Sequence, residues 1–189
     1  SELKWNKRRW FIRLLSYLPG VEAIFLTNTF AYHNVKTDSD IDILIVTRPH
    51  NIWATRFYTT AVAKLFGVRP RPHRTKDTLC LSFYITPTGL TQLEKLRSDD
   101  NDALEAYWIV QAMPVYDPRG YAKQITNSEW LKQVLPNNQP VQQHINRSIK
   151  HTWFHNITHT LGRFLLWNQL LKSFQLWIMP KRLKELSGP

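Results

Sequence analysis

The chain lacks the cysteines that a disulfide-stapled protein or a multi-cysteine zinc protein needs. Its 189 residues include one cysteine, Cys80, so neither an internal disulfide framework nor a zinc site built from several thiolates can form. A single cysteine fits a reducing compartment, and we expect a cytoplasmic location. Because Cys80 stands in the middle of an apolar run, we expect a buried small side chain there and not a reactive nucleophile.

A long uninterrupted hydrophobic run is also missing. The stretch at 161–179 is apolar enough to suggest a membrane span, but charged and amide side chains interrupt it about once per turn: Arg163, Asn168, Gln169, Lys172 and Gln175. A transmembrane helix rarely carries charged and amide side chains in every turn, so we expect no membrane span here. The basic N-terminal stretch is broken by Arg13 and is followed by no small-residue cleavage pattern, so it does not resemble a signal peptide either.

Acidic residues are in the minority. Lys and Arg number 25 against 14 Asp and Glu, which gives a formal charge of +11. The positive field favours polyanionic partners such as nucleotides, RNA, DNA or acidic lipid. A hydrophobic fraction of 43% and an aromatic fraction of 13% exclude a disordered chain. We expect one globular domain, with or without a helical extension.

Hydrophobic periodicity predicts an α/β protein of the α+β type. Helical spacing indicates a first helix that ends at Pro19-Gly20, and a second from Asn51, as its N-cap, to Gly67. Strand patterns lie at 21–27, 41–47 and 79–85, with a candidate edge strand at 113–117. The sequence beyond the edge strand has mostly helical patterns. The whole sequence therefore predicts a core at 1–118 and a helical C-terminal extension at 119–189 that packs on this core. The polar segment 136–140 marks the boundary of the C-terminal helices.

Two aspartates at the start of the second strand carry the strongest chemical signal. Side chains alternate along a strand, so Asp40 and Asp42 point to one face while Ile41 and Ile43 enter the core. Adjacent carboxylates repel each other, and a divalent cation is the usual reason for tolerating them. The alternative is that the two aspartates belong to a polar turn that leads into a strand. An Asp-x-Asp pattern without further context favours this alternative, because so short a motif often occurs without a metal site.

The surrounding sequence has a spacing that is known from one family. The first strand ends in LTNT, and ten residues separate Thr29 from Asp40. A small polar pair, ten residues and Asp-x-Asp in a hydrophobic strand resembles the minimal nucleotidyltransferases of the DNA polymerase β superfamily, whose signature is Gly-Ser, ten residues, Asp-x-Asp. The match covers about residues 18–47, and the later sequence more loosely resembles uncharacterised bacterial proteins described only as nucleotidyltransferase domain-containing.

That resemblance implies a mixed sheet with helices packed on one side and a requirement for Mg²⁺ (or Mn²⁺). It also implies transfer of a nucleoside monophosphate from a nucleoside triphosphate such as ATP to a nucleic acid, a small molecule or a protein. Asp40 and Asp42 would be the catalytic metal ligands, and Asn28 and Thr29 would contact the phosphates. Thr29 keeps the hydroxyl of the family's Ser, whereas Asn28 replaces a Gly and loses its backbone freedom.

The sequence departs from the family pattern at a third acidic position. Active members usually add a carboxylate from a later strand, but the run at 79–85 contains no acid. Asp38, Asp77 or a water molecule would have to complete the metal site. The alternative function is a catalytically degenerate relative that binds nucleic acid or a protein and performs no chemistry.

Basic residues cluster in the loop before the third strand. Two prolines stiffen it, and it carries Arg69, Arg71, His73, Arg74 and Lys76. We expect Arg69, Arg71 and Arg74 to hold the triphosphate or a nucleic-acid backbone; the alternative is a solvated run of charge. A second basic patch near the N-terminus, at Lys7, Arg8, Arg9 and Arg13, is interleaved with Trp5 and Trp10, and for these tryptophans we favour packing over base stacking.

The C-terminal part contains a histidine series and an apolar face. His144, His151, His155 and His159 are spaced by seven, four and four residues, which on one continuous helix would place them on one face. A pair at i and i+4 can chelate zinc, but we favour imidazoles that meet polar neighbours or solvent; contact with the acceptor is a third alternative. Helical spacing of apolar residues at 161–178 predicts packing against the sheet, or a face that joins two copies in a homodimer.

Overall fold

A mixed four-stranded sheet organises the protein. The computed structural model describes residues 2–27, 40–70, 78–92, 102–137, 139, 145–165 and 167–178. The strands are β1 (Val21–Leu26), β2 (Ile41–Thr47), β3 (Leu79–Ile85) and β4 (Met113–Tyr116), in the spatial order β3-β2-β1-β4. β1 runs antiparallel to β2 and β4, and β2 runs parallel to β3. The predicted strands and the α+β class are confirmed.

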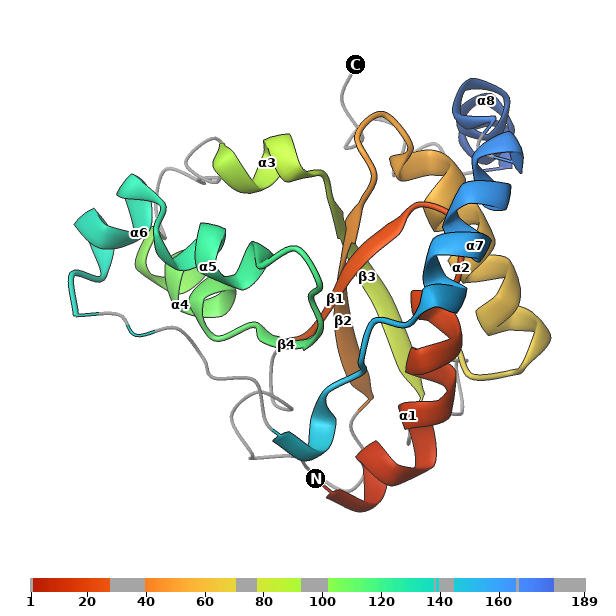
Figure 1. Cartoon of the computed structure of the whole chain (residues 1–189). Helices are drawn as coiled ribbons and strands as arrows, with labels where there is room; N and C mark the ends of the chain where they lie inside the picture. The colour runs from red at the N-terminus through yellow and green to blue at the C-terminus, as the bar shows by residue number, and fades with distance from the viewer. Residues whose placement is uncertain are drawn as a thin grey trace.

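Helices surround this sheet (Figure 1). They are α1 (Glu2–Ser16), α2 (Ile52–Leu65), α3 (Pro87–Thr91), α4 (Asp102–Val110), α5 (Tyr121–Thr126), α6 (Glu129–Val134), α7 (Trp153–Leu161) and α8 (Asn168–Ile178), with short 3₁₀ turns η3 (Ile145–Arg147) and η4 (Gly162–Leu165). α2 ends as its sequence predicts, because Gly67 adopts a positive φ of 60° that residues with a Cβ rarely accept.

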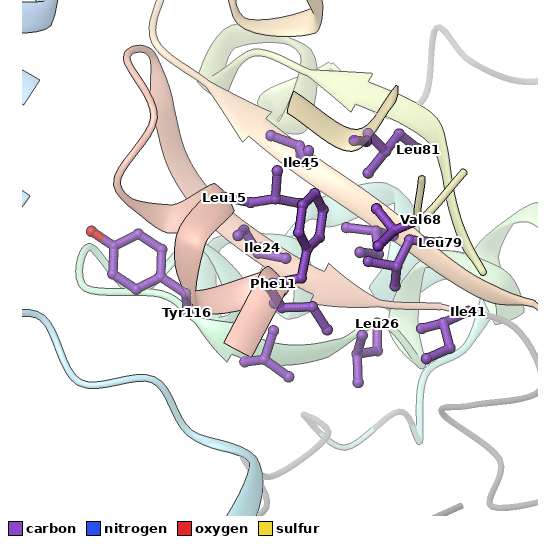
Figure 2. Packing of buried hydrophobic residues seen from close by; sticks show 14 of the residues in the cluster. Phe11, Leu15, Ile24, Leu26, Ile41, Ile45, Val68, Leu79, Leu81 and Tyr116 are labelled. Carbon is purple, nitrogen blue, oxygen red and sulfur yellow. The ribbon is translucent and has the colours of Figure 1, made fainter. Parts of the chain in front are cut away.

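One face of the sheet is covered by α1 and α2. Phe11 and Leu15 of α1 pack onto the strand residues Ile24 and Ile45 (Figure 2). All four side chains are 0% exposed. The apolar face of α1 that the sequence indicates is therefore a core face.

The opposite face is also covered. Phe25 of β1 and Leu44 of β2 pack with Ala106 of α4, Ile125 of α5 and Leu131 of α6, and Figure 1 shows the two groups of helices on opposite sides of the sheet. The helices therefore lie on both sides, and the expectation of one covered face is wrong. The reason is visible in β1, whose six residues are all buried, because a strand that is buried on both sides needs a partner layer on each.

The start of α2 is capped differently from the prediction. Asn51 occupies the N-cap position, but its side chain makes no capping hydrogen bond and donates instead to the carbonyl of Pro49 over 3.0 Å. The side-chain oxygen of Asn168 accepts from the backbone N–H groups of Trp53 and Ala54, over 3.0 and 3.1 Å. The first residue of α8 thus caps α2.

The C-terminal apolar residues do not pack on the sheet. α8 lies against α2 and has no buried residue. Many large apolar side chains of α7, η4, Trp167 and α8 are exposed, among them Trp153, Leu161, Phe164, Leu165, Trp167, Leu170, Phe174, Trp177 and Ile178. Packing against the sheet is therefore wrong for this segment, because other helices already cover both sheet faces. A face that joins two copies stays a prediction.

In the described part of the chain, no helix combines the length and the apolar composition that crossing a bilayer requires.

Candidate functional site

Asp40 and Asp42 lie at the start of the central strand β2. Both are half-buried, whereas Ile41 and Ile43 are 0% exposed in the core. The alternation predicted from the sequence is therefore present. Asp42 shares its sheet face with Leu44, which packs under the second group of helices.

Three neighbouring strands bring polar side chains together around Asp42. The backbone N–H of Thr27, just after β1, donates to the Asp42 carbonyl over 3.1 Å, and Asp42 pairs with Cys80 in the parallel β2–β3 ladder. Paired residues of neighbouring strands point to the same face. Thr27, Asp42 and Cys80 therefore form a row across the sheet, with Asp40 beside it.

The cysteine belongs to the candidate metal site. A carboxylate oxygen of Asp40, one of Asp42 and the sulfur of Cys80 all lie within 4.8 Å of one another. Cys80 is half-buried and not fully buried, so the expectation of a buried side chain is wrong, and its lack of nucleophilic reactivity stays a prediction. The sequence carries one signal for this neighbour, because Asp42 and Cys80 are each the second residue of their strand.

The hydroxyl of Thr27 adds a polar group to the same end of the sheet. Thr27 is 0% exposed, and its side-chain oxygen has no hydrogen-bond partner among the described residues. A buried polar group without a partner costs free energy, and a bound ligand or water commonly satisfies such a group. Thr27 was not singled out from the sequence.

Burial and charge repulsion act together on Asp40. Burial raises the pKa of the Asp40 carboxyl above its ordinary value, and the neighbouring Asp42 charge raises it further. The ammonium of Lys4, on the first turn of α1, lowers this pKa by a smaller amount. A cation bound between the two carboxylates would remove the repulsion, so the electrostatics of the pair fit a metal site.

Lys4 is a second residue that sequence analysis missed. It is 9% exposed, and its charge acts on Asp40, whereas the N-terminal basic patch chosen from the sequence begins at Lys7, further along α1. Arg69 is half-buried, and its charge acts on Tyr84. Trp5, which we expected to pack, is 2% exposed in the core.

Several predicted site residues fall outside the described ranges. They are Asn28 and Thr29 of the expected phosphate-binding turn, Arg71, His73, Arg74 and Lys76 of the basic loop, and the two candidate third acids, Asp38 and Asp77. Their placement relative to Asp40 and Asp42 stays a prediction.

The donor set fits a divalent metal through the aspartates. Carboxylate oxygens suit Mg²⁺ and Mn²⁺, and Mg²⁺ commonly takes one or two carboxylates while water and substrate phosphates complete its coordination. A thiol is a soft ligand that suits zinc better than Mg²⁺. For Mg²⁺ we therefore regard Asp40 and Asp42 as the ligands and Cys80 as a close neighbour.

The histidine series does not lie on one helix. His151 precedes α7, and His144 lies outside the described residues. The side-chain oxygen of Ser16 donates to the Arg13 carbonyl and so accepts from Nε2 of His155 over 3.0 Å. Nδ1 of His155 accepts from the Thr152 backbone N–H, also over 3.0 Å. Both ring nitrogens of His155 are engaged, which argues against a zinc ligand there.

Comparisons with protein families, with curated proteins and with solved structures found no significant match.

Proposed function

We propose that the protein binds a divalent cation with Asp40 and Asp42 and transfers a nucleoside monophosphate from a nucleoside triphosphate to an acceptor. The observation that carries the proposal is the pair of half-buried carboxylates at the start of a central strand, with ligand oxygens within 4.8 Å of each other. Bound Mg²⁺ or Mn²⁺ would neutralise charge on the triphosphate and orient it for attack by the acceptor at the α-phosphate, where the bond to the β-phosphate breaks and pyrophosphate leaves.

The residues around the pair have complementary roles in this proposal. Asp40 and Asp42 hold the cation, and the Thr27 hydroxyl, which has no hydrogen-bond partner among the described residues, donates to a phosphate oxygen. The ammonium of Lys4 offsets negative charge at the same end of the sheet. Asn28 and Thr29 contact the phosphates, and Arg69, Arg71 and Arg74 supply further positive charge. The acceptor is a nucleic acid, a small molecule or a protein.

Label transfer tests the proposal directly. The purified protein is incubated with each α-labelled nucleoside triphosphate and Mg²⁺ or Mn²⁺, with RNA, cell lysate or the protein itself as acceptor. We expect metal-dependent labelling, and we expect Asp40→Asn to reduce it by at least about 100-fold, the scale of losing a central electrostatic contact. Glu129→Gln is the matched control, because Glu129 is exposed, with 83% of its side-chain surface accessible.

Two results would count against the proposal in different ways. The absence of transfer by the unmodified protein with every nucleotide, metal and acceptor would rule out the enzyme. Transfer that persists in Asp40→Asn would leave the enzyme in place and refute the site.

A second candidate function is a catalytically degenerate relative that binds nucleic acid. Cys80 supports this alternative, since it occupies the strand position beside Asp42, where a carboxylate would complete a three-acid site. The net charge of +11 suits a polyanion. This alternative predicts RNA or DNA binding that weakens steeply with salt and is unchanged in Asp40→Asn, whereas the enzyme predicts metal-dependent nucleotide binding that is lost in that variant.

A further inference from the structure

A cavity of about 310 Å³ lies away from the aspartate pair. Its walls come from the start of β1, the segments just after β2 and β4, the segment before α7, and α7 and η4. We call it the basic cavity, after Arg48, Arg119 and Arg163, which line it together with the polar side chains of His151, Asn156 and Thr160. None of these arginines was selected from the sequence as a site residue.

The basic cavity and the aspartate pair lie at opposite ends of β2. In the β1–β2 ladder, Val21 pairs with Thr47 next to the cavity, and Leu26 pairs with Ile43 next to Asp42. The six residue steps from Asp42 to Arg48 span about 20 Å in an extended strand. Figure 2 shows the same separation, with Tyr116 of the cavity wall and Ile41 at opposite ends of the core cluster. The two sites are therefore distinct.

The charges that face the cavity are mostly positive. Glu22 is the one acidic residue among its described lining residues. It accepts a hydrogen bond from the Tyr121 hydroxyl and pairs with Arg119 over 3.2 Å. Asp117, which adjoins the wall, accepts with its carboxylate oxygens from backbone N–H groups at the start of α5. Glu22 therefore offsets Arg119, and Asp117 is engaged elsewhere.

Arg48 and Arg163 keep their charges available. In the described part of the chain, neither forms an ion pair with an acidic side chain. The positive charge of Arg48 acts on the cavity residue His159. Burial lowers the pKa of His159, and the charges of His151 and Arg48 lower it further. Concentrated positive charge in a concave site favours an anionic ligand.

The backbones of both arginines are anchored to the same turn. The Arg48 N–H donates to the Gly20 carbonyl over 2.7 Å. Gly162, which precedes Arg163, packs so closely on Pro19 that an added Cβ would lie 2.6 Å from the Pro19 ring. The backbone of Arg48 and the residue before Arg163 are thus both held against the Pro19-Gly20 turn, and such preorganisation lowers the entropic cost of binding.

Polar side chains joined by hydrogen bonds form a further part of the wall. The Tyr116 hydroxyl lies 2.9 Å from Nδ1 of His151, and Nε2 of His151 lies 3.0 Å from the Asn156 side-chain oxygen. Nε2 of His159 lies 2.9 Å from the Ser16 carbonyl. The imidazoles are therefore positioned by hydrogen bonds, and the Thr160 hydroxyl adds a further polar group to the wall.

We propose that the basic cavity binds a small phosphate-bearing molecule, with its phosphate between Arg48 and Arg163. Guanidinium groups present paired N–H donors that match phosphate oxygens. The volume lies at the lower end of the range for small-molecule sites, which suits inorganic phosphate or a compact phosphomonoester. The inference is independent of the nucleotidyltransferase proposal.

Calorimetric titration tests this proposal. The full chain is titrated in EDTA with inorganic phosphate and, separately, with glycerol phosphate, so that the free ion is distinguished from a phosphomonoester. We expect saturable binding of at least one probe. Arg48→Gln and Arg163→Gln should each weaken it by about tenfold or more, the scale of a lost hydrogen bond to a charged group.

Arg9→Gln provides the matched control. Arg9 is an exposed residue of α1, and its substitution removes the same charge without touching the cavity. Thermal unfolding verifies that each variant is folded. Three results would overturn the proposal. Arg9→Gln could weaken binding as much as the cavity variants do, Asp40→Asn could abolish binding, or neither probe could show saturable binding.

Discussion

Asp42 and Cys80 are paired residues of the parallel β2–β3 ladder, and each is the second residue of its strand. The thiol therefore stands beside the two candidate metal ligands, with its sulfur within 4.8 Å of an oxygen of each carboxylate. This relationship makes position 80 the most direct place to change the chemistry of the site.

We predict that Cys80→Asp strengthens Mg²⁺ binding. A carboxylate at this position would add a third hard oxygen ligand within reach of Asp40 and Asp42. We expect the Mg²⁺ affinity, measured by calorimetry, to rise severalfold, and transfer activity to rise with it. Cys80→Ser is the matched control, because it removes the thiol without adding charge. Equal Mg²⁺ affinity in the two variants would argue against a metal at this position.

Asp40→Asn should stabilise the metal-free protein at neutral pH. The folded-state pKa of Asp40 is raised by burial and by Asp42, so the folded state disfavours its charge and loses stability as pH rises above the ordinary carboxyl pKa. Asparagine removes that cost. In EDTA we expect a higher melting temperature for Asp40→Asn than for the unmodified protein.

Adding Mg²⁺ should reverse that order. A ligand that binds only the folded state raises the melting temperature, and Asp40→Asn lacks one ligand. We therefore expect Mg²⁺ to stabilise the unmodified protein and to leave the variant unchanged. A melting temperature of Asp40→Asn below that of the unmodified protein in EDTA would show that Asp40 has a structural role.

The strands and the orientation of the aspartates could be predicted from the sequence because both depend on local pattern. Alternation in IDILIV places Ile41 and Ile43 in the core and Asp42 opposite them, whatever surrounds the strand. The position of Cys80 could not be predicted in the same way, because it depends on the register between two strands that are separated by α2. Lys4 was missed for a related reason, since α1 meets Asp40 only in the folded chain.

The cap of α2 shows the same limit. Asn51 has the residue type and position of an N-cap, yet Asn168 accepts the two hydrogen bonds. A cap can be predicted from sequence only when the capping residue directly precedes the helix, and Asn168 lies more than a hundred residues from the start of α2. The exposed apolar face of α8 was misassigned because periodicity reveals that a helix has an apolar face without revealing what that face contacts.

We predict that Asn168→Ala destabilises the protein more than Asn51→Ala does. Removing Asn168 leaves the N–H groups of Trp53 and Ala54 without their acceptor, a change that costs about 1 kcal/mol for a typical cap. Asn51→Ala removes only the bond to the Pro49 carbonyl. Urea unfolding of the two variants measures the difference. A larger loss in Asn51→Ala would show that the local residue, and not α8, caps the helix.

His155 is held in its neutral form. It is 0% exposed, its Nε2 donates to Ser16, and its Nδ1 accepts from the Thr152 N–H. Protonation of the ring would add a proton to Nδ1, where it would face the Thr152 N–H and break this hydrogen bond. Burial lowers the pKa of His155 to about 4, and the charges of His151 and His159 act in the same direction.

The free energy of unfolding should therefore fall as the pH falls from about 6.5 toward about 4. His155 has a pKa of about 6.5 when unfolded and about 4 when folded, so the unfolded state binds more protons in this interval and gains stability as the pH falls. The linkage amounts to about 2 kcal/mol between about pH 7.5 and about pH 5. Urea unfolding at several pH values measures this dependence. His155→Phe should be less stable than the unmodified protein at about pH 7.5, but its free energy of unfolding should fall less steeply with pH below about pH 6.5.

His50→Gln is the control, because His50 is exposed, and its free energy of unfolding should depend on pH as that of the unmodified protein does. If the pH dependence is unchanged in His155→Phe, groups other than His155 cause it.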